Sequence, residues 1–126
     1  VKRGMIVCGC DGMDEITLTG TTHISEIKDD NVTSYDINPA DYGLKITDAE
    51  QLKGGNGEEN AETTKAILAG KETGAKRDIV LLNAGAAIYC AGIADTLAEG
   101  IEKAKESIDS GKALEVLNKL VEFTNR

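Results

Sequence analysis

The sequence predicts an α/β fold in which short strands and a hairpin are followed by about four helices. Turn residues and β-branched residues dominate the first forty positions, whereas after residue 46 apolar residues recur three and four positions apart. The chain has 126 residues, of which 40% are hydrophobic, so it is long enough to bury the core of one globular domain. Aromatic residues make up only 3%, so this core must be mainly aliphatic.

Four apolar or β-branched runs are predicted to form the strands. The first, Met-Ile-Val-Cys-Gly at 5–9, is continuously apolar, as expected of a strand that is buried on both faces. The other three runs are 15–20, 22–28 and 32–37. An Asp-Asp-Asn turn at 29–31 favours a hairpin, and Pro39 ends the strand region because its nitrogen carries no hydrogen to donate.

The helices are predicted from caps and from periodicity. Capping-box spacing, with Thr or Asn three residues before Glu, occurs at 47–50, 56–59 and 96–99. Apolar stripes of helical period cover 78–95, 97–108 and 113–121. Gly111 separates the last two stripes.

The segment 81–94 is apolar on nearly all sides, with small residues at 84–87. We expect it to be a buried helix whose small residues let neighbouring elements approach closely. Asn83 within it needs hydrogen-bond partners, so it either ties down backbone or faces a site as a polar contact.

Composition excludes several classes of partner. The formal net charge is −8 and no cluster of Lys or Arg exceeds two in a row, so we expect neither nucleic acid nor an anionic membrane as partner. No apolar run approaches the roughly 18–20 residues that span a bilayer. The three cysteines, two of them in a Cys8-x-Cys10 pair, favour reduced thiols in a cytoplasmic protein, since no second pair of metal ligands follows.

Three acidic dipeptides occur, and two have structural explanations. Asp29-Asp30 falls in the hairpin turn, and Glu58-Glu59 falls in the first turn of a helix, where carboxylates are favourable. Asp14-Glu15 instead follows the first strand through a glycine-bearing loop. Neighbouring carboxylates there can hold Mg²⁺ if a substrate supplies phosphate oxygens, although a solvated turn explains the same pattern.

The remaining candidates favour structural explanations. Lys-Gly-Gly-Asn-Gly-Glu-Glu-Asn-Ala at 53–61 could cradle phosphate at a helix N-terminus, but it matches no phosphate-loop motif and its acidic residues oppose an anion. We interpret it as a turn. His23 is the single histidine and is interpreted as a surface or packing residue, so no catalytic triad is predicted.

Read in order, several blocks resemble the C-terminal part of anthranilate phosphoribosyltransferase. They begin with Asp-Gly-Met-Asp-Glu at 11–15 and include Leu-Lys-Gly-Gly-Asn-Gly-Glu-Glu-Asn-Ala at 52–61 and Asn-Ala-Gly-Ala-Ala-Ile-Tyr at 83–89. The resemblance covers nearly the whole chain. It departs from the family at Cys8, where His is usual, and at 20–22, where Gly-Pro-Thr is usual.

The resemblance implies a function and a set of site residues. Such enzymes transfer phosphoribosyl from phosphoribosyl pyrophosphate to anthranilate in tryptophan biosynthesis, with Mg²⁺ as cofactor. It implies that Asp14 and Glu15 bind the metal, that Asp11 and Gly12 support their loop, and that no residue here acts as a catalytic acid or base.

The resemblance also implies that residues 1–126 are a single partial domain. Residues 1–38 would be the strand region with the metal loop, and residues 39–126 the helical region. The family's phosphoribosyl pyrophosphate loop and its anthranilate-binding helical domain precede this region, so we expect it to be inactive alone and to self-associate or bind the missing N-terminal part. Two alternatives stay open: part of a pyrimidine-nucleoside phosphorylase, or a non-catalytic binding or scaffold domain.

Overall fold

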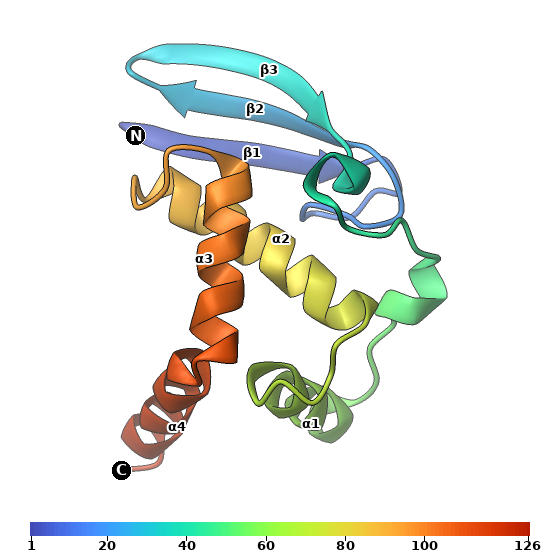
Figure 1. The fold of residues 1–126 in the computed structure, drawn as a ribbon, viewed down its shortest axis with the longest axis vertical. Helices are drawn as coiled ribbons and strands as arrows, with labels where there is room; N and C mark the ends of the chain where they lie inside the picture. The colour runs from blue at the N-terminus through green and yellow to red at the C-terminus, as the bar shows by residue number, and fades with distance from the viewer.

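The computed structural model describes residues 1–126 and shows three strands followed by four α-helices, which confirms the predicted α/β order (Figure 1). The strands are β1 (Arg3–Gly9), β2 (Thr22–Lys28) and β3 (Asn31–Ile37). Two short 3-10 helices follow, η1 (Pro39–Tyr42) and η2 (Ala49–Leu52). The α-helices are α1 (Gly57–Leu68), α2 (Ala75–Cys90), α3 (Leu97–Asp109) and α4 (Lys112–Thr124). None of them is long and apolar enough to cross a membrane.

The sheet is antiparallel, with strand order β1-β2-β3. The predicted hairpin joins β2 to β3 through a two-residue turn, in which Lys28 pairs with Asn31. Asp29 and Asp30 occupy the turn with φ of 50° and 60°. Positive φ at both central residues matches the right-handed twist of the strands, and Asp tolerates it better than most residues.

The prediction that the run 5–9 is buried on both faces is wrong for this structure. β1 is an edge strand with one covered face: Met5 and Val7 pack against the core, whereas Ile6 is 69% exposed and Cys8 is exposed. A short apolar run does not by itself distinguish a strand buried on two faces from a half-buried one.

The predicted strand at 15–20 is also wrong, because these residues form a loop between β1 and β2. Its buried residues Ile16–Leu18 are consecutive instead of alternating. Side chains take the place of a strand partner: the Thr17 N–H donates to Thr22 Oγ1 at 3.0 Å, and the Thr19 N–H donates to Thr17 Oγ1 at 3.0 Å. Threonine, which favours strands, here supplies hydrogen bonds that replace a ladder.

Helix α2 packs against β1 on one side of the sheet, and α3 packs on α2 (Figure 1). The core lies between these helices and the sheet. Ile24 and Ile37 enter this core from the sheet, and Leu82, which is fully buried, enters from α2. The buried core residues of α3 are Leu97, Ile101, Ala104 and Ile108. This core holds α2 directly beneath the loop that follows β1.

The structure can be compared with the three helix starts that were predicted from capping-box spacing. Asn56 and Glu59 form the expected capping box on α1, and Thr96 caps α3 by accepting from the Glu99 N–H. The prediction for 47–50 is wrong: Asp48 occupies the N-cap position of η2 and makes no capping hydrogen bond.

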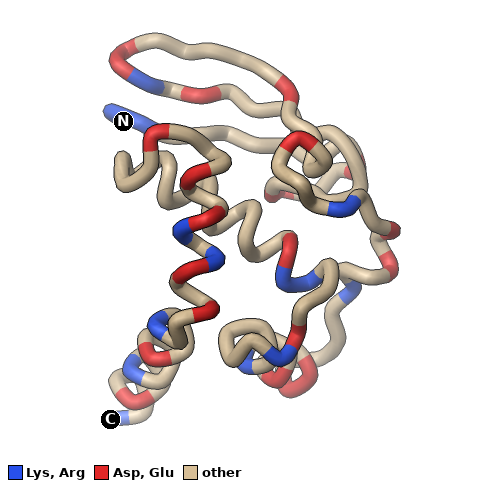
Figure 2. Tube along the Cα trace, viewed as in Figure 1, with Lys and Arg blue, Asp and Glu red and all other residues tan.

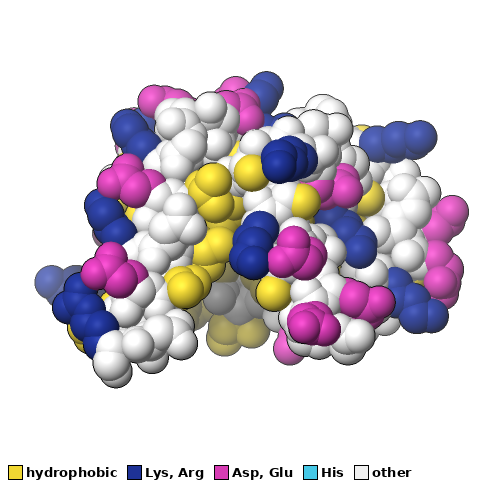
Figure 3. Space-filling view, turned by 90° about the horizontal axis from the view of Figure 1, so that it is seen from below, with side chains coloured by type: hydrophobic (Ala, Val, Ile, Leu, Met, Phe, Trp, Pro, Cys, Tyr) yellow, Lys and Arg dark blue, Asp and Glu magenta, His cyan; other side chains and the backbone are white.

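Helix α4 buries none of its residues, and Val116 and Phe123 are 65% and 69% exposed. Seen from below, hydrophobic side chains gather in a central hollow and charged ones surround them (Figure 3). Acidic and basic residues are interspersed along α3 and α4, so neither helix presents a surface of one sign (Figure 2).

Candidate functional site

The loop that follows β1 carries the predicted site residues, and Asp11 organises it. One Asp11 oxygen, Oδ2, accepts hydrogen bonds from the hydroxyls of Thr17 and Thr19, both at 2.7 Å, and Oδ1 accepts from the Met13 N–H at 3.1 Å. Gly12 has a φ of +85°, a conformation that suits glycine. Asp11 and Gly12 therefore shape the loop.

The hydrogen bonds also affect the acidity of Asp11. Its slight burial raises the pKa, but bonds from the Thr19 and Thr17 hydroxyls and from the Met13 amide outweigh this and hold the pKa below 3.8. Hydrogen bonds to the charged form of a carboxyl group favour that form.

Asp11 should make the chain sensitive to acid. Because its folded-state pKa is lowered, its contribution to stability is present above pH 3.8 and is lost as the pH falls through the lowered value. We therefore expect the unfolding free energy of Asp11→Asn to fall less steeply than that of the wild type between about pH 5 and about pH 2. Urea titrations at several pH values measure this, with Asp48→Asn, an exposed residue without a capping bond, as control. Parallel curves for wild type and Asp11→Asn would contradict the expectation.

Asp14 and Glu15 lie next along this loop. Asp14 is exposed and Glu15 is partly exposed, and neither carboxylate makes a hydrogen bond or an ion pair with another side chain or with backbone. Mg²⁺ binds through one or two carboxylates and completes its octahedron with water and substrate phosphate. Two uncommitted carboxylates on an ordered loop fit that ion, although no group of three or more His, Cys, Asp or Glu forms a metal cluster here.

The Asn83 side chain binds backbone groups, which is one of the two roles that the sequence suggested for it. Its Oδ1 accepts from the Ile16 N–H at 2.9 Å, and its Nδ2 donates to the Ile16 carbonyl at 2.8 Å and to the Ile79 carbonyl at 3.0 Å. Both backbone polar groups of the residue after Glu15 are thus held by one side chain of α2.

His23 and the glycine-rich segment are placed on the surface. The His23 Nδ1 lies 2.7 Å from Asp36 Oδ1, across the β2–β3 pair, with both side chains more than half exposed. At the start of α1, the Glu59 carboxylate accepts from the Asn56 N–H and the Asn60 side chain bonds Gly55. Side chains of the protein itself occupy this helix N-terminus, as expected of a structural turn.

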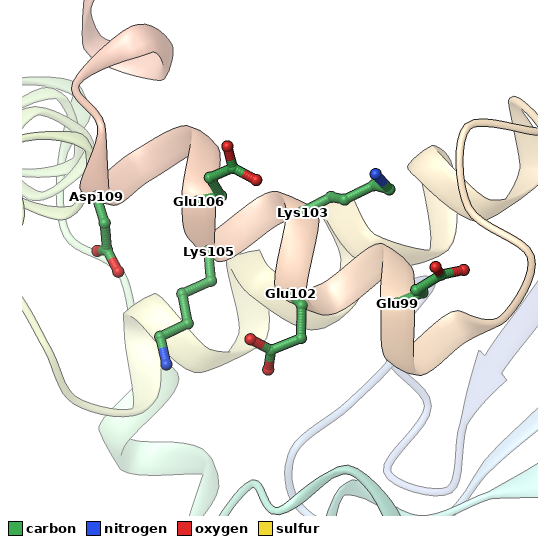
Figure 4. Close-up of a pocket in the computed structure, with 6 residues that line it drawn as sticks. All are labelled: Glu99, Glu102, Lys103, Lys105, Glu106 and Asp109. Carbon is green, nitrogen blue, oxygen red and sulfur yellow. The ribbon is translucent and has the colours of Figure 1, made fainter.

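A hollow on the outer side of α3 has no features of a ligand site. It is lined by six charged residues and no apolar one: Glu99, Glu102, Lys103, Lys105, Glu106 and Asp109. They extend from successive turns of the helix (Figure 4). Ligand pockets are mostly apolar with a few polar groups, so this surface is better explained as a solvated helix face.

Sequence reasoning missed one buried charged group. Glu26 on β2 is only 9% exposed, and its two oxygens accept from Tyr89 OH at 2.7 Å and Tyr35 OH at 2.8 Å. The Arg3 guanidinium lies 4.2 Å from the centre of the Tyr89 ring. Strand alternation could have revealed Glu26, because it shares the inward face of β2 with Ile24.

Comparisons with known proteins identify the relatives of this chain. The family model described as "Glycosyl transferase family, a/b domain" matches residues 1–114. Anthranilate phosphoribosyltransferase of Acetivibrio thermocellus is 48% identical over 125 residues, which are 99% of this chain and 36% of the relative. The chain thus spans little more than a third of the length of the curated relatives it matches.

Solved structures of anthranilate phosphoribosyltransferases are also similar to this chain. Anthranilate phosphoribosyltransferase from Thermus thermophilus superposes with a TM-score of 0.89 at 39% identity, over 98% of this chain and 36% of that one. The Saccharomyces cerevisiae enzyme, in a structure in complex with PRPP and Mg, gives a TM-score of 0.84 at 29% identity, over 92% of this chain and 33% of that one. The same yeast enzyme has also been solved with 4-fluoroanthranilate. The chain belongs to the glycosyl transferase family, a/b domain, and corresponds to the C-terminal portion of the anthranilate phosphoribosyltransferases.

Proposed function

We propose that this chain is the magnesium-binding portion of an anthranilate phosphoribosyltransferase, with Asp14 and Glu15 as the metal ligands. The proposal rests on a difference in hydrogen bonding between the three carboxylates of one loop. Asp11 is occupied by three donors, whereas Asp14 and Glu15 are held in the same loop with their oxygens uncommitted. The yeast relative, whose structure holds PRPP and Mg, supports the choice of ion and substrate.

The proposed reaction joins the anthranilate nitrogen to the ribose carbon while the bond from that carbon to the pyrophosphate oxygen breaks. The nitrogen loses one proton to solvent, and pyrophosphate leaves with the bonding electron pair. Mg²⁺ bound at this loop would neutralise the charge that develops on the leaving pyrophosphate. This chain's part is to hold two carboxylates at a fixed place, and no acid or base among the described residues is required. The residues that bind anthranilate, and those that make the remaining contacts to phosphate, would lie outside residues 1–126.

A chimera tests the proposal. In it, residues 1–126 replace the equivalent portion of the Thermus thermophilus relative, and anthranilate consumption is measured with PRPP and Mg²⁺. We expect the chimera to be active, and Asp14→Asn and Glu15→Gln each to lower kcat/KM by about a hundredfold or more, because a charge that stabilises the transition state is lost.

Glu58→Gln provides the matched control, since Glu58 is an exposed member of another acidic pair and its side chain makes no hydrogen bond or ion pair. It should leave kcat/KM unchanged. Full activity in Asp14→Asn and Glu15→Gln would refute the assignment of the metal ligands. An active chimera that accepts a pyrimidine nucleoside with phosphate, but not anthranilate, would refute the proposed substrate.

A further inference from the structure

The residue that follows the carboxylate pair is fixed from outside the loop. Ile16 is 1% exposed, and both its N–H and its carbonyl are bonded to the single side chain of Asn83, at 2.9 and 2.8 Å. The third bond of Asn83, to the Ile79 carbonyl one turn earlier in α2, sets the orientation of the amide group. The position of the loop is thereby tied to the axis of α2.

A second set of bonds fixes the loop from within. The hydroxyl of Thr17, the next residue, donates to Asp11, and the Thr17 N–H donates to Thr22 at the start of β2. Asp14 and Glu15 therefore lie between two fixed points, Met13 and Ile16, whose backbone N–H groups are bonded to Asp11 and Asn83. Of the two fixing groups, Asn83 alone belongs to a helix of the core.

We propose that Asn83 is a positioning residue for the carboxylate pair: acting through the backbone of Ile16, it holds Asp14 and Glu15 in place before a divalent cation arrives. The inference rests on the proposed function and adds the group that determines how well the pair binds. A loop without this support must be ordered by the cation itself, which costs binding free energy. Losing an outer partner of a metal ligand typically lowers metal affinity about 10–100-fold.

The experiment uses the ¹⁵N-labelled chain with Mn²⁺ as a paramagnetic probe in place of Mg²⁺. In the wild type, Mn²⁺ should broaden the amide signals of residues 13–16 more strongly than those of more distant residues, and the concentration dependence of this selective broadening gives an apparent Kd. We expect Asn83→Ala to raise this Kd by about tenfold, measured where circular dichroism shows the variant to be folded.

Two controls separate positioning from a general loss of stability. Asn60→Ala removes a matching pair of bonds, from the Asn60 side chain to the N–H and carbonyl of Gly55, at a distant turn. Ile108→Val shortens a buried side chain of α3 and weakens the core alone. Neither should change the Kd for Mn²⁺.

Amide hydrogen exchange of the wild type provides a second readout that needs no variant to fold. With the loop already ordered, the Ile16 N–H should be protected without metal, and Mg²⁺ should change its exchange rate by less than about twofold. Strong slowing of Ile16 exchange by Mg²⁺ would show that the cation orders the loop, which overturns the inference.

The outcomes also distinguish this inference from the proposed function. If Asp14→Asn abolishes the selective broadening while Asn83→Ala leaves the Kd unchanged, the metal site stands and the role of Asn83 is refuted. If Mn²⁺ causes no selective broadening at residues 13–16 in the wild type, either alone or with inorganic pyrophosphate added to complete its coordination, the proposed metal site fails, and this inference fails with it.

Discussion

Gly100→Ala is expected to destabilise the chain by about 3 kcal/mol, at the upper end of the cost of overpacking a core. A Cβ at Gly100 would lie 2.2 Å from the carbonyl oxygen of Gly85 on α2. In the other direction, a Cβ at Gly85 would lie 2.7 Å from the backbone nitrogen of Ile101. Both obstacles are backbone atoms, so no rotamer change relieves them and the two helices must separate.

Separation of α2 from α3 would also weaken packing and hydrogen bonds away from the two glycines. Ile101, which is 5% exposed, packs at the crossing, and α2 also carries the Asn83 side chain that bonds Ile16. We therefore expect the urea midpoint to fall and the amide exchange of Ile16 to rise in the same variant.

Gly57→Ala is the matched control for this prediction. Gly57 is the first residue of α1, and a Cβ there meets no atom within 4 Å. The same substitution should be neutral or should stabilise by up to about 1 kcal/mol, since alanine restricts the unfolded chain. A loss below about 1 kcal/mol in Gly100→Ala would mean that α2 and α3 can move apart at little cost, contrary to the packing described.

This helix crossing shows what the sequence can and cannot predict. The small residues at 84–87 predicted a close approach to the segment 81–94, and the crossing confirms it at Gly85. The partner, Gly100, could not be identified, because it lies in another helix beyond a turn and nothing local in the sequence pairs the two glycines. Local periodicity predicts which face is buried, whereas tertiary packing decides what covers it.

The candidate loop shows the same limit. The sequence singled out Asp14 and Glu15 by position, and the resemblance separated them from Asp11. The error at 15–20 arose because threonine favours strands, whereas here Thr17 bonds Asp11 and the backbone of Thr19. Hydrogen bonds from side chain to backbone compete with the backbone ladder of a strand. A pattern of residue types does not reveal which of the two arrangements forms.

Glu26→Ala is expected to have the second large effect, a loss of about 3 kcal/mol. Truncation removes the acceptor of the two hydroxyls, of Tyr89 and of Tyr35, and bonds to a charged group are worth about 1.5–3 kcal/mol each before relaxation. Both tyrosines are partly buried, so their hydroxyls regain only part of this through water. Glu26→Gln keeps one acceptor and one donor in place and should lose about half as much. Equal stability of Glu26→Ala and the wild type in urea titrations would show that water replaces the carboxylate at no cost.

The pH dependence separates the role of Glu26 as an acceptor from its packing. Burial, followed by the bond to the Glu26 carboxylate and its charge, raises the pKa of Tyr35 above its ordinary value of 10.0. A raised folded-state pKa means that the stabilising contribution is complete below pH 10 and is lost as the pH rises further. Wild-type unfolding free energy should therefore fall as the pH rises above about 10, and Tyr35→Phe should flatten that fall although it is less stable at neutral pH. An equally steep decline in Tyr35→Phe would mean that other groups cause the alkaline loss, among them Tyr89, whose pKa is also raised by its hydrogen bond to Glu26.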